Sequence, residues 1–461
     1  MRFSAVVTTG IYCHPGCTAR PNAANVRAYE SAAAAEAAGF RACLRCRPYR
    51  LTTSLTATGP ELVCRATHLI SDGVLDRGTE GDLAARLGVS ARHLRRLFAE
   101  HVGASPDQLA RSRRTHFARR LLDDTDLTVT DIAYASGFGS LRQLNRACQE
   151  VFRSSPSELR ARRRSTDRLV ADGGLTLRLP FEGPLDWDTM LGYFALRAVR
   201  GVECVADGVY RRTIVVDGAP GVLELSRGGA DHLLLRAHLP RVEGLIHVVQ
   251  RARQIFGLDR DPRPADEHLS ADPIIGPLVH DHPGLRVPGT WDPVETGVRA
   301  IIGQQVSVAG ASTVMARLVE RAGTPVPGLA QLGLTHTFPS AAELAEADLD
   351  AIGMPTARAA AITSFAAAVD KGEAALDGSL GLDELVAALC AVRGVGPWTA
   401  HYLALRLGEP DALPVADLGL RRAARPDAPL STAALAEASE AWRPWRSTAA
   451  LRLWLSEGAA A

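Results

Sequence analysis

Apolar positions between residues 80 and 160 recur with a helical spacing, and they fall into two similar halves. Each half predicts a short helix, a glycine-containing turn, a second helix and a Ser-Pro stop, as in EGDLAARLGVSARHLRRLFAEHVGASP and TVTDIAYASGFGSLRQLNRACQEVFRSSP. Such a repeat is typical of two helix-turn-helix motifs in tandem. We therefore expect an all-α domain over residues 80–164, with a mixed connector over residues 51–79 before it.

The pattern changes after residue 174. Strand-like runs with accompanying helical stretches predict a small α+β domain over residues 175–285, as in LTLRLP, GVYRRTIVV and HLLLRAHL. From residue 286 to residue 461 the chain is rich in Ala and Leu and is punctuated by Gly and Pro, which predicts an all-α domain. A basic linker is expected over residues 165–174. The chain is thus predicted to be a multidomain α+β protein.

Four of the eight cysteines lie in two close pairs near the start of the chain. Cys13 and Cys17 form a C-x3-C pair in IYCHPGC, and Cys43 and Cys46 form a C-x2-C pair in GFRACLRCRP. Two such pairs can complete a tetrahedron of thiolates, so residues 1–50 are predicted to hold one zinc ion. No organic cofactor and no iron–sulfur cluster are expected.

Two other interpretations of these pairs are a disulfide framework and a zinc site that is only structural. The disulfide framework is disfavoured because no signal peptide precedes the pairs, which predicts a reducing cytoplasm. The remaining thiols are interpreted as small buried side chains; they are Cys64, Cys148, Cys204 and Cys390. The VHDH stretch at residues 279–282 is interpreted as a loop and not as a metal site.

Charge is balanced over the whole chain but not within its parts. The net charge is +1, no run is apolar enough to span a bilayer, and Lys371 is the only lysine. Residues 80–164 hold 16 Arg against 10 Asp and Glu, a local net charge of +6 that predicts DNA binding. The alternative is a helical bundle with a solvated charged face. A soluble monomer that binds double-stranded DNA, away from any membrane, is expected.

The second helix of each motif is predicted to present its polar side chains to base edges in the major groove. The candidate residues are Arg92, His93, Arg95 and Arg96 in the first motif and Arg142, Gln143, Asn145 and Arg146 in the second. This stretch resembles the tandem DNA reader of the AraC family of transcription activators, on the run DIAYASGFGSLRQLNRACQEVFRSSPSELR. The resemblance implies an activator that works with RNA polymerase.

Residues 4–48 resemble the N-terminal domain of the Ada methylation-response regulators, on AVVTTGIYCHPGC and on NVRAYESAAAAEAAGFRACLRCRP. The resemblance implies that a zinc-bound Cys13 thiolate accepts a methyl group from a DNA phosphotriester and that this strengthens DNA binding. It also implies that Arg45 and Arg47 hold phosphates. Family members carry an additional segment before this region, so we expect either that the start codon is assigned too late here or that the domain is trimmed.

The run CAVRGVGPWTAHYLALRLGEPDALPVADLGLRR at residues 390–422 combines a glycine hairpin with a later acid. Amides around Gly394 and Gly396 are predicted to hold a phosphate, and Asp417 follows in an apolar setting. This is the signature of the helix-hairpin-helix glycosylase superfamily. Residues 175–458 resemble its AlkA-type alkylbase members, on PGLRVPGTWDPVETGVRAIIGQQVSVAGA among other runs.

The second resemblance implies a monofunctional glycosylase that flips out and excises N-alkylated cationic purines such as 3-methyladenine. It assigns Asp417 as the catalytic carboxylate and Gln305 as the wedge that fills the space left by the flipped nucleotide. It assigns the aromatic wall of the base pocket to Tyr193, Trp398, Tyr402 and Trp454. The glycosylase then stands where Ada proteins usually carry an alkylguanine transferase. The alternative is an activator whose glycosylase half only binds DNA.

Overall fold

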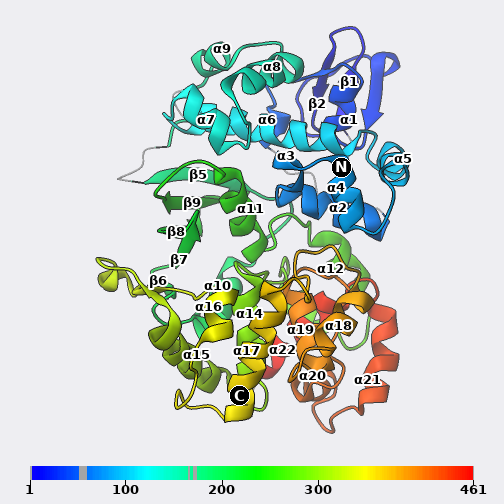
Figure 1. Cartoon of the computed structure of the whole chain (residues 1–461). Helices are drawn as coiled ribbons and strands as arrows, with labels where there is room; N and C mark the ends of the chain where they lie inside the picture. Colours follow the sequence, from blue (N-terminus) through cyan, green and yellow to red (C-terminus); the bar gives the residue numbers. More distant parts are fainter. Residues whose placement is uncertain (1–2, 51–59, 165–166, 170–173, 460–461) are drawn as a thin grey trace. The chain divides into compact units, whose positions relative to one another are not determined.

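The structure is a computed structural model that describes residues 3–50, 60–164, 167–169 and 174–459. The chain folds into two compact units (Figure 1). The first comprises residues 1–182 and 232–252, and the second comprises residues 183–231 and 253–461. Most of the predicted linker and residues 51–59 of the predicted connector lie outside the described residues.

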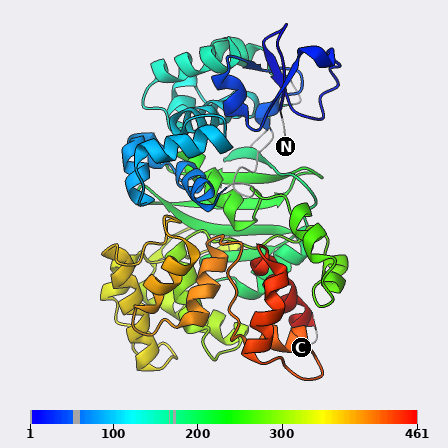
Figure 2. The ribbon, with the colours of Figure 1, turned by 90° about the vertical axis from the view of Figure 1, so that its right-hand side faces the viewer.

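The first fifty residues form a small four-stranded sheet in the order β3-β1-β2-β4, with one helix beside it (Figure 2). Its elements are β1 (Phe3–Val6), β2 (Ile11–Cys13), β3 (Val26–Tyr29), α1 (Ala32–Ala37) and β4 (Arg41–Ala42). Strands β2 and β4 run parallel, with Tyr12 opposite Ala42. This register places Cys13, the last residue of β2, beside Cys43, the first residue after β4.

Residues 60–164 form a series of helices joined by short turns. The helices are α2 (Glu61–Ser71), α3 (Val74–Arg77), α4 (Glu80–Arg86), α5 (Ala91–His101), α6 (Pro106–Asp124), α7 (Val129–Ala135), α8 (Leu141–Phe152) and α9 (Pro156–Ala161). Helices α4 and α5 form the first predicted motif and α7 and α8 the second. The long helix α6 joins them and packs against α1, α2, α7, α8 and α9.

The sequence predicts a connector for residues 60–79, whereas the structure has helices α2 and α3 there. Val63, Ala66 and Ile70 follow a helical spacing and lie in one apolar cluster with Leu94 and Phe98 of α5. An amphipathic face of this kind must be buried against another element, which makes these residues part of the helical domain. Gly103, which follows α5, has a left-handed φ of 74°. A Cβ atom at this position would lie 2.9 Å from the Cβ atom of Ala34, so the turn after α5 approaches α1 closely.

A buried ionic cluster ties the metal-domain segment to α6. Asp123 is fully buried, with its Oδ1 2.6 Å from Arg119 Nη1 and its Oδ2 accepting a hydrogen bond from the Tyr49 hydroxyl at 3.0 Å. Arg50 Nη2 lies 3.4 Å from the same Oδ2. A second buried contact joins Glu36 of α1 to His116 of α6 at 2.7 Å. Removing Asp123 would leave the buried Arg119 without its carboxylate partner.

We expect Asp123→Ala to lower the free energy of unfolding of the first unit by about 3–5 kcal/mol, because it leaves the buried Arg119 without its carboxylate partner. Asp126→Ala, at an exposed ion pair two residues beyond α6, is the matched control and should change little. Hydrogen–deuterium exchange of α6 is the appropriate measurement. All six tryptophans lie in the second unit, so tryptophan fluorescence reports that unit alone. Equal protection of α6 in both variants would contradict the prediction.

The region predicted as a small α+β domain contributes to both units. In the first unit, β5 (Leu175–Pro180) pairs antiparallel with β9 (His232–His238), which is followed by α11 (Leu245–Ile255). In the second unit, β6 (Glu203–Ala206), β7 (Val209–Val216) and β8 (Ala219–Arg227) form an antiparallel meander after α10 (Trp187–Arg197). The strands and helices predicted for residues 175–285 are thus present in the structure.

The remainder of the second unit is mostly helical. Its helices are α12 (Arg263–Leu269), α13 (Gly276–Asp281), α14 (Pro293–Ile302), α15 (Val308–Ala322), α16 (Ala341–Glu346), α17 (Thr356–Asp370), α18 (Leu382–Cys390), α19 (Pro397–Arg406), α20 (Leu418–Ala424), α21 (Thr432–Ala438) and α22 (Arg446–Ala459). The short strands β10 (Thr324–Pro325) and β11 (His336–Thr337) pair antiparallel.

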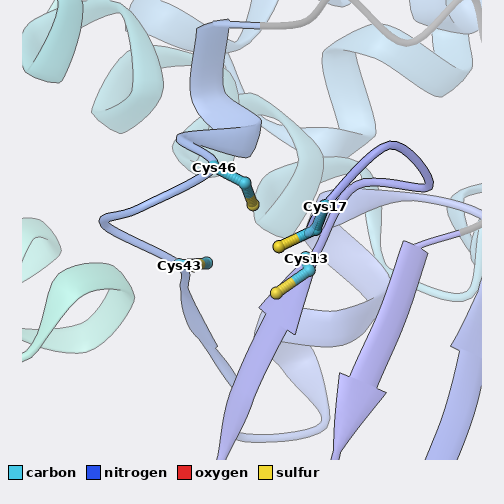
Figure 3. A group of neighbouring side chains, drawn as sticks. All are labelled: Cys13, Cys17, Cys43 and Cys46. Carbon is cyan, nitrogen blue, oxygen red and sulfur yellow. The ribbon is translucent and has the colours of Figure 1, made fainter. Parts of the chain in front are cut away.

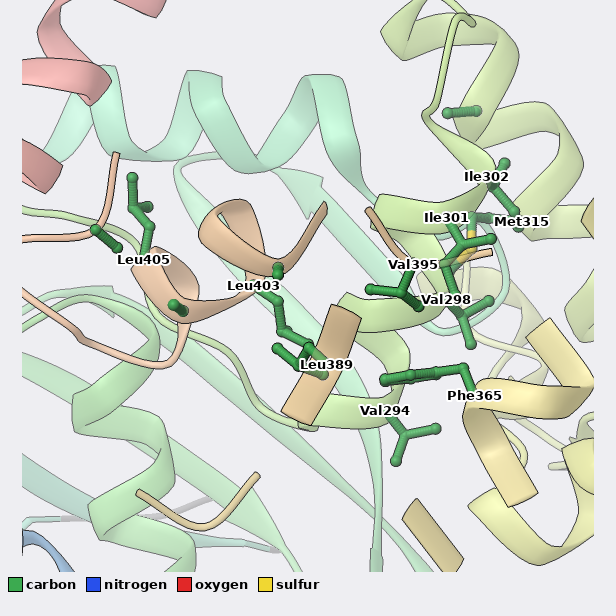
Figure 4. Packing of buried hydrophobic residues seen from close by; sticks show 14 of the residues in the cluster. Val294, Val298, Ile301, Ile302, Met315, Phe365, Leu389, Val395, Leu403 and Leu405 are labelled. Atoms are coloured by element: carbon green, nitrogen blue, oxygen red, sulfur yellow. The ribbon is translucent and has the colours of Figure 1, made fainter. Parts of the chain in front are cut away.

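The core of these helices is one apolar cluster that centres on α14 (Figure 4). Val298 and Ile301 of α14 pack with Phe365 of α17 and with Leu403 of α19. Gly297 lets α14 approach α17 closely, since a Cβ atom there would lie 2.3 Å from the Phe365 ring. This packing fixes α18 and α19, and therefore the hairpin between them.

Candidate functional sites

The four paired cysteines form one cluster of sulfur atoms (Figure 3). Cys13 and Cys17 come from the end of β2 and the turn after it, while Cys43 and Cys46 come from the loop after β4. All four sulfur atoms lie within 4.8 Å of one another. Four converging thiols without a carboxylate or an imidazole are the donor set of a structural zinc site, so these residues fit a zinc ion.

Hydrogen bonds within the cluster favour negative charge on the sulfur of Cys46 over that of Cys13. Hydrogen bonding from Cys13 and from the His14 amide lowers the pKa of Cys46 to about 5, although partial burial opposes this. The pKa of Cys13 is raised by its hydrogen bond to Cys46 and by burial. The Ala19 amide donates to the Cys17 sulfur at 3.5 Å. Cys13 and Cys43 are buried, whereas Cys17 and Cys46 are half-buried.

The two arginines predicted to hold phosphates beside the cluster are placed differently. Arg45 is exposed, as a phosphate contact requires. Arg47 is buried, and its guanidinium donates to Asp167 Oδ2 at 2.6 Å. In this conformation the guanidinium is already paired and is shielded from solvent, so a contact between Arg47 and a DNA phosphate stays a prediction that would require the pair to open. No local pattern in the sequence indicates a partner 120 residues away.

The predicted reader helices α5 and α8 begin in the same way. The side chains of Ser90 and Ser140 cap them by accepting hydrogen bonds from the amides of the third helical residues, at 3.2 Å and 3.3 Å. The arginines named in the sequence analysis are all exposed on these helices; they are Arg92, Arg95, Arg96, Arg142 and Arg146. Gln143 is exposed as well, and His93 and Asn145 are half-exposed.

Several of these side chains have protein partners. Arg95 pairs with Glu80, and Arg146 donates to Glu150 at 2.9 Å. The Asn145 side chain donates to the Leu141 carbonyl at 3.0 Å. The exposed pair of Arg146 and Glu150 is weak enough to be exchanged for a contact with DNA, whereas Glu80 is buried. The apolar sides of both helices, by contrast, are buried, including Leu144 and Ala147 of α8.

The glycine hairpin lies between α18 and α19. Gly394 has a φ of 86°, and a Cβ atom there would lie 2.3 Å from that of Ala361, so only glycine fits. Gly396 is the N-cap of α19. Gln304, which the sequence analysis did not single out, donates to the Gly394 carbonyl at 3.1 Å and to the Thr399 hydroxyl at 2.9 Å. It joins the hairpin to the loop after α14.

That loop carries Gln305, the predicted wedge. Gln305 is exposed and has a φ of 57°, a left-handed conformation that is uncommon outside glycine. The Gln304 carbonyl beside it accepts a hydrogen bond from Arg358 at 2.7 Å. The neighbouring Val308 side chain, the first residue of α15, is 43% exposed. The loop therefore presents its side chains to solvent from a fixed backbone.

Asp417 is the N-cap of α20 and is held by three donors. Its Oδ1 accepts from the Leu420 amide at 2.8 Å and from the Trp454 indole N–H at 3.1 Å. Its Oδ2 accepts from the Trp398 indole N–H at 2.7 Å. The backbone cap alone would be an ordinary structural role. Two indole donors from α19 and α22 go beyond that role and fix the carboxylate within a group of aromatic rings.

Three of the four predicted wall residues lie together around Asp417. The Trp398 and Tyr402 rings are stacked, with 5.5 Å between their centroids and an interplanar angle of 8°. The centroids of the Tyr402 and Trp454 rings lie 5.8 Å apart. Tyr193 of α10 is buried behind them and lies beside Tyr402 through a shared arginine. The aromatic cluster and the carboxylate thus form one site, and Tyr193 lies behind it, next to Tyr402.

That shared arginine is Arg406, which the sequence analysis missed. Its Nη1 donates to the hydroxyls of Tyr193 and Tyr402, each at 3.1 Å. Its other nitrogens donate to the carbonyls of Pro288 and Gly289, each at 2.7 Å. The signal that could have found it is an arginine one turn after Tyr402 in the otherwise apolar run YLALRL. A buried guanidinium in such a helix needs several acceptors.

The other thiols and the VHDH stretch do not add a site. Cys148 is buried as predicted, but Cys64, Cys204 and Cys390 are only half-buried, which corrects that part of the prediction. His280 contacts the Gly276 carbonyl at 2.8 Å, and His282 lies 3.1 Å from Asp186. Within residues 3–50, 60–164, 167–169 and 174–459, the four paired cysteines are the one group arranged to hold a metal ion.

Four domain families match successive parts of the chain. The metal binding domain of Ada matches residues 2–49, and a helix-turn-helix domain matches residues 83–162. The AlkA N-terminal domain matches residues 176–292, and the HhH-GPD superfamily of base excision DNA repair proteins matches residues 298–446. A Mycobacterium tuberculosis protein described as "Probable bifunctional transcriptional activator/DNA repair enzyme AlkA" is 41% identical, over 98% of this chain and 92% of its own length.

The chain belongs to this family of bifunctional activator and repair proteins. Its two halves also match separate Escherichia coli proteins. DNA-3-methyladenine glycosylase 2 is 34% identical over 61% of this chain and 97% of its own length. The bifunctional transcriptional activator/DNA repair enzyme Ada is 31% identical over 34% of this chain and 43% of its own length. The resemblances and the multidomain fold class predicted from the sequence are confirmed.

Solved structures add support for the fold of the C-terminal half. The 3-methyladenine DNA-glycosylase from Archaeoglobus fulgidus has a TM-score of 0.55 and 23% identity, over 61% of this chain and 98% of that chain. At this identity the likeness concerns the fold alone. In the part of the chain that the structure describes, every helix is too short or too polar to cross a membrane.

Proposed function

We propose that the second unit removes N-alkylated, positively charged purines such as 3-methyladenine from DNA and leaves the strand intact. The observation that carries this proposal is the position of Asp417, a carboxylate held by two indoles within an aromatic cluster that follows the glycine hairpin. An alkylated purine carries a positive charge, so it is attracted to the faces of Trp and Tyr rings and leaves readily.

The residues divide the work of excision. Hairpin amides around Gly394 and Gly396 hold the DNA backbone, and Gln305 fills the space that the flipped nucleotide vacates. The base stacks against Trp398 and Trp454. As the bond from the base to the sugar breaks, its electron pair leaves with the base and the sugar becomes positively charged. The Asp417 carboxylate stabilises that charge, and water then adds to the sugar.

The experiment that tests this proposal is an excision assay on duplexes that each contain one lesion. Cationic lesions and neutral lesions are compared, and released base is measured separately from strand cleavage. Release of cationic bases without cleavage supports the proposal. Binding without release of any base would favour the alternative, an activator whose glycosylase half only binds DNA.

We further propose that the first unit senses alkylation through Cys13. A zinc ion bound by the four thiols would keep them deprotonated and nucleophilic. The Cys13 sulfur forms a bond to the methyl carbon of a phosphotriester, the bond from that carbon to oxygen breaks, and the phosphate recovers its negative charge. The thiolate becomes a thioether, so the protein loses one negative charge near DNA. Exposed Arg45 is the arginine that remains available for a phosphate.

Methylation of Cys13 should raise the affinity for operator DNA about fivefold at low salt, since one repulsive charge disappears. Operator binding is measured by titration before and after treatment with methylphosphotriester DNA, at several salt concentrations, with mass spectrometry to locate the methyl group. Cys13→Ser should show no gain. A methyl group on the more exposed Cys17 or Cys46, or an unchanged affinity, would contradict the proposal.

The same proposal includes the cellular setting. A bacterial-type cytoplasmic protein associated with the nucleoid would keep the thiols reduced and give both units access to DNA. Activation implies RNA polymerase as a partner of the first unit. We propose that the protein acts as a monomer, because the two reader helices α5 and α8 of one chain already supply two major-groove contacts.

A further inference from the structure

Arg406 lies behind the aromatic wall, where it faces two phenols rather than a carboxylate. It donates to the hydroxyls of Tyr193 and Tyr402 and to two main-chain carbonyls. Tyr402 in turn stacks on Trp398, whose indole donates to Asp417. A continuous set of contacts therefore leads from the buried guanidinium to the proposed catalytic carboxylate.

The surroundings of Arg406 carry an excess of positive charge. One pocket of the second unit is lined by four arginines and two glutamates, namely Arg197, Arg212, Arg299, Arg406, Glu203 and Glu295. Arg212 already lies 2.7 Å from Glu295 and 3.5 Å from Glu203. Burial raises the pKa of Glu295 although Arg212 lies beside it. The lining of this pocket therefore holds more arginines than carboxylates.

Tyr402 is the acid best placed to offset this excess of positive charge. The charged and titratable groups that face it are Arg406 of α19, Tyr193 and Arg197 of α10, and Arg299 of α14. Burial alone would raise the pKa of the Tyr402 phenol, but Arg406 and Arg197 outweigh burial and lower that pKa to about 8. Burial raises the pKa of Tyr193, which donates to Tyr402. Of these two phenols, Tyr402 is therefore the one that ionises first.

We propose that Arg406 is a positioning residue that holds negative charge on the Tyr402 oxygen, so that the aromatic wall selects positively charged bases over neutral ones. The inference rests on the proposed glycosylase function and assigns the determinant of its base selectivity. When the phenol loses its proton to water, the wall gains a negative charge beside the stacked Trp398 ring. A cationic base then binds more favourably, whereas a neutral base gains little.

This predicts that selectivity depends on pH. The ratio of kcat/KM for a 3-methyladenine duplex to that for a neutral 1,N6-ethenoadenine duplex should rise about tenfold between pH 7 and pH 9, as a phenol with a pKa near 8 ionises. The ratio cancels effects that are common to both substrates. Arg406→Met should move the rise to higher pH, Arg406→Lys should retain it, and Tyr402→Phe should abolish it.

A second measurement does not depend on excision. Ultraviolet titration of tyrosinate should show that one of the seven tyrosines ionises about two pH units below the usual value of about 10. Tyr402→Phe should remove this early step, and Tyr134→Phe, at an exposed position in the first unit, should leave it unchanged. If Arg406→Met does not fold, the wild type and Tyr402→Phe still decide the matter.

The outcomes separate this inference from the proposed function. A wild-type protein that releases neither base would overturn the glycosylase proposal, while the tyrosinate titration would still report the charge on Tyr402. Excision with a selectivity ratio that stays constant from pH 7 to pH 9 would overturn the inference alone. An early tyrosinate step that survives Tyr402→Phe would overturn it too.

Discussion

Asp417→Asn should lower the rate of base release by about a hundredfold or more and leave DNA binding nearly unchanged. Removing one preorganised charge from the transition state has effects of this size in other enzymes. Asparagine is also a good N-cap, so α20 and the hydrogen bond from Leu420 are retained. The amide cannot offer a full negative charge to the sugar, and only one of its two ends can accept an indole N–H.

A matched control is Asp272→Asn. Asp272 Oδ1 accepts from the amides of Ile274 and Ile275, each at 2.9 Å, in the turn that precedes α13, and it has no aromatic partner among its hydrogen bonds. Excision at single-turnover conditions separates the chemical step from product release, and fluorescence anisotropy measures DNA affinity. Full activity in the Asp417→Asn protein would remove Asp417 from the mechanism. A parallel loss in Asp272→Asn would indicate a general defect of the fold.

Base release should also proceed without a covalent link to DNA. Glycosylases that cut the strand use a lysine amine, which attacks the sugar to form a Schiff base. Lys371 is the only lysine of the chain, and it lies at the end of α17, outside the hairpin. The position after the hairpin proline is Trp398, which contacts Asp417 instead. Borohydride treatment during turnover should therefore trap no adduct, and an adduct that forms would contradict this mechanism.

Features that depend on short separations along the chain were predictable from the sequence. The spacing of the cysteine pairs, the repeated Ser-Pro stops and the run from the hairpin to Asp417 each lie within one or two elements. Their local geometry follows from turn chemistry and helix capping. The structure indeed has the four sulfur atoms together, the two reader helices capped by serine, and Asp417 at the start of α20.

Contacts between distant segments could not be predicted in the same way. Arg406 meets Tyr193 across 213 residues, and Arg47 meets Asp167 across 120. Charged side chains are usually exposed to solvent, so no local sequence pattern predicts that one of them is buried against a distant partner. Helix α2 is a different case. The run ELVCRATHLI carries an apolar face, although the sequence analysis predicts a connector at this place. Its partner, α5, lies beyond two further helices.

Zinc removal should unfold the metal domain while leaving base excision intact. A module of about fifty residues buries too little apolar surface to be stable by itself. Its sheet has strands of two to four residues, and α1 supplies mainly alanines to the core. Metal binding to four thiolates contributes about 10 kcal/mol or more to folding in small zinc domains. Without it, we expect the loops that carry Cys17 and Cys46 to separate first.

The effect should extend to α6 through its buried contacts with the metal domain. Glu36, Tyr49 and Arg50 are partners of His116 and Asp123. If the metal domain unfolds, these groups on α6 lose their partners, and the first unit loses stability beyond the module itself. Chelation should therefore lower amide protection both in residues 3–50 and in α6. The second unit, which contains Asp417 and the aromatic wall, has no part in this site.

The experiment combines metal analysis, hydrogen exchange and excision on one preparation. Freshly purified protein should contain one zinc per chain, and Cys43→Ser should reproduce the effect of chelation. Cys390→Ser, which changes a half-buried thiol outside the cluster, is the matched control and should retain both zinc and protection. Zinc near zero in the untreated protein would end the proposal of a metal site. Full protection of residues 3–50 after chelation would show instead that α6 and the apolar core suffice to hold the metal domain.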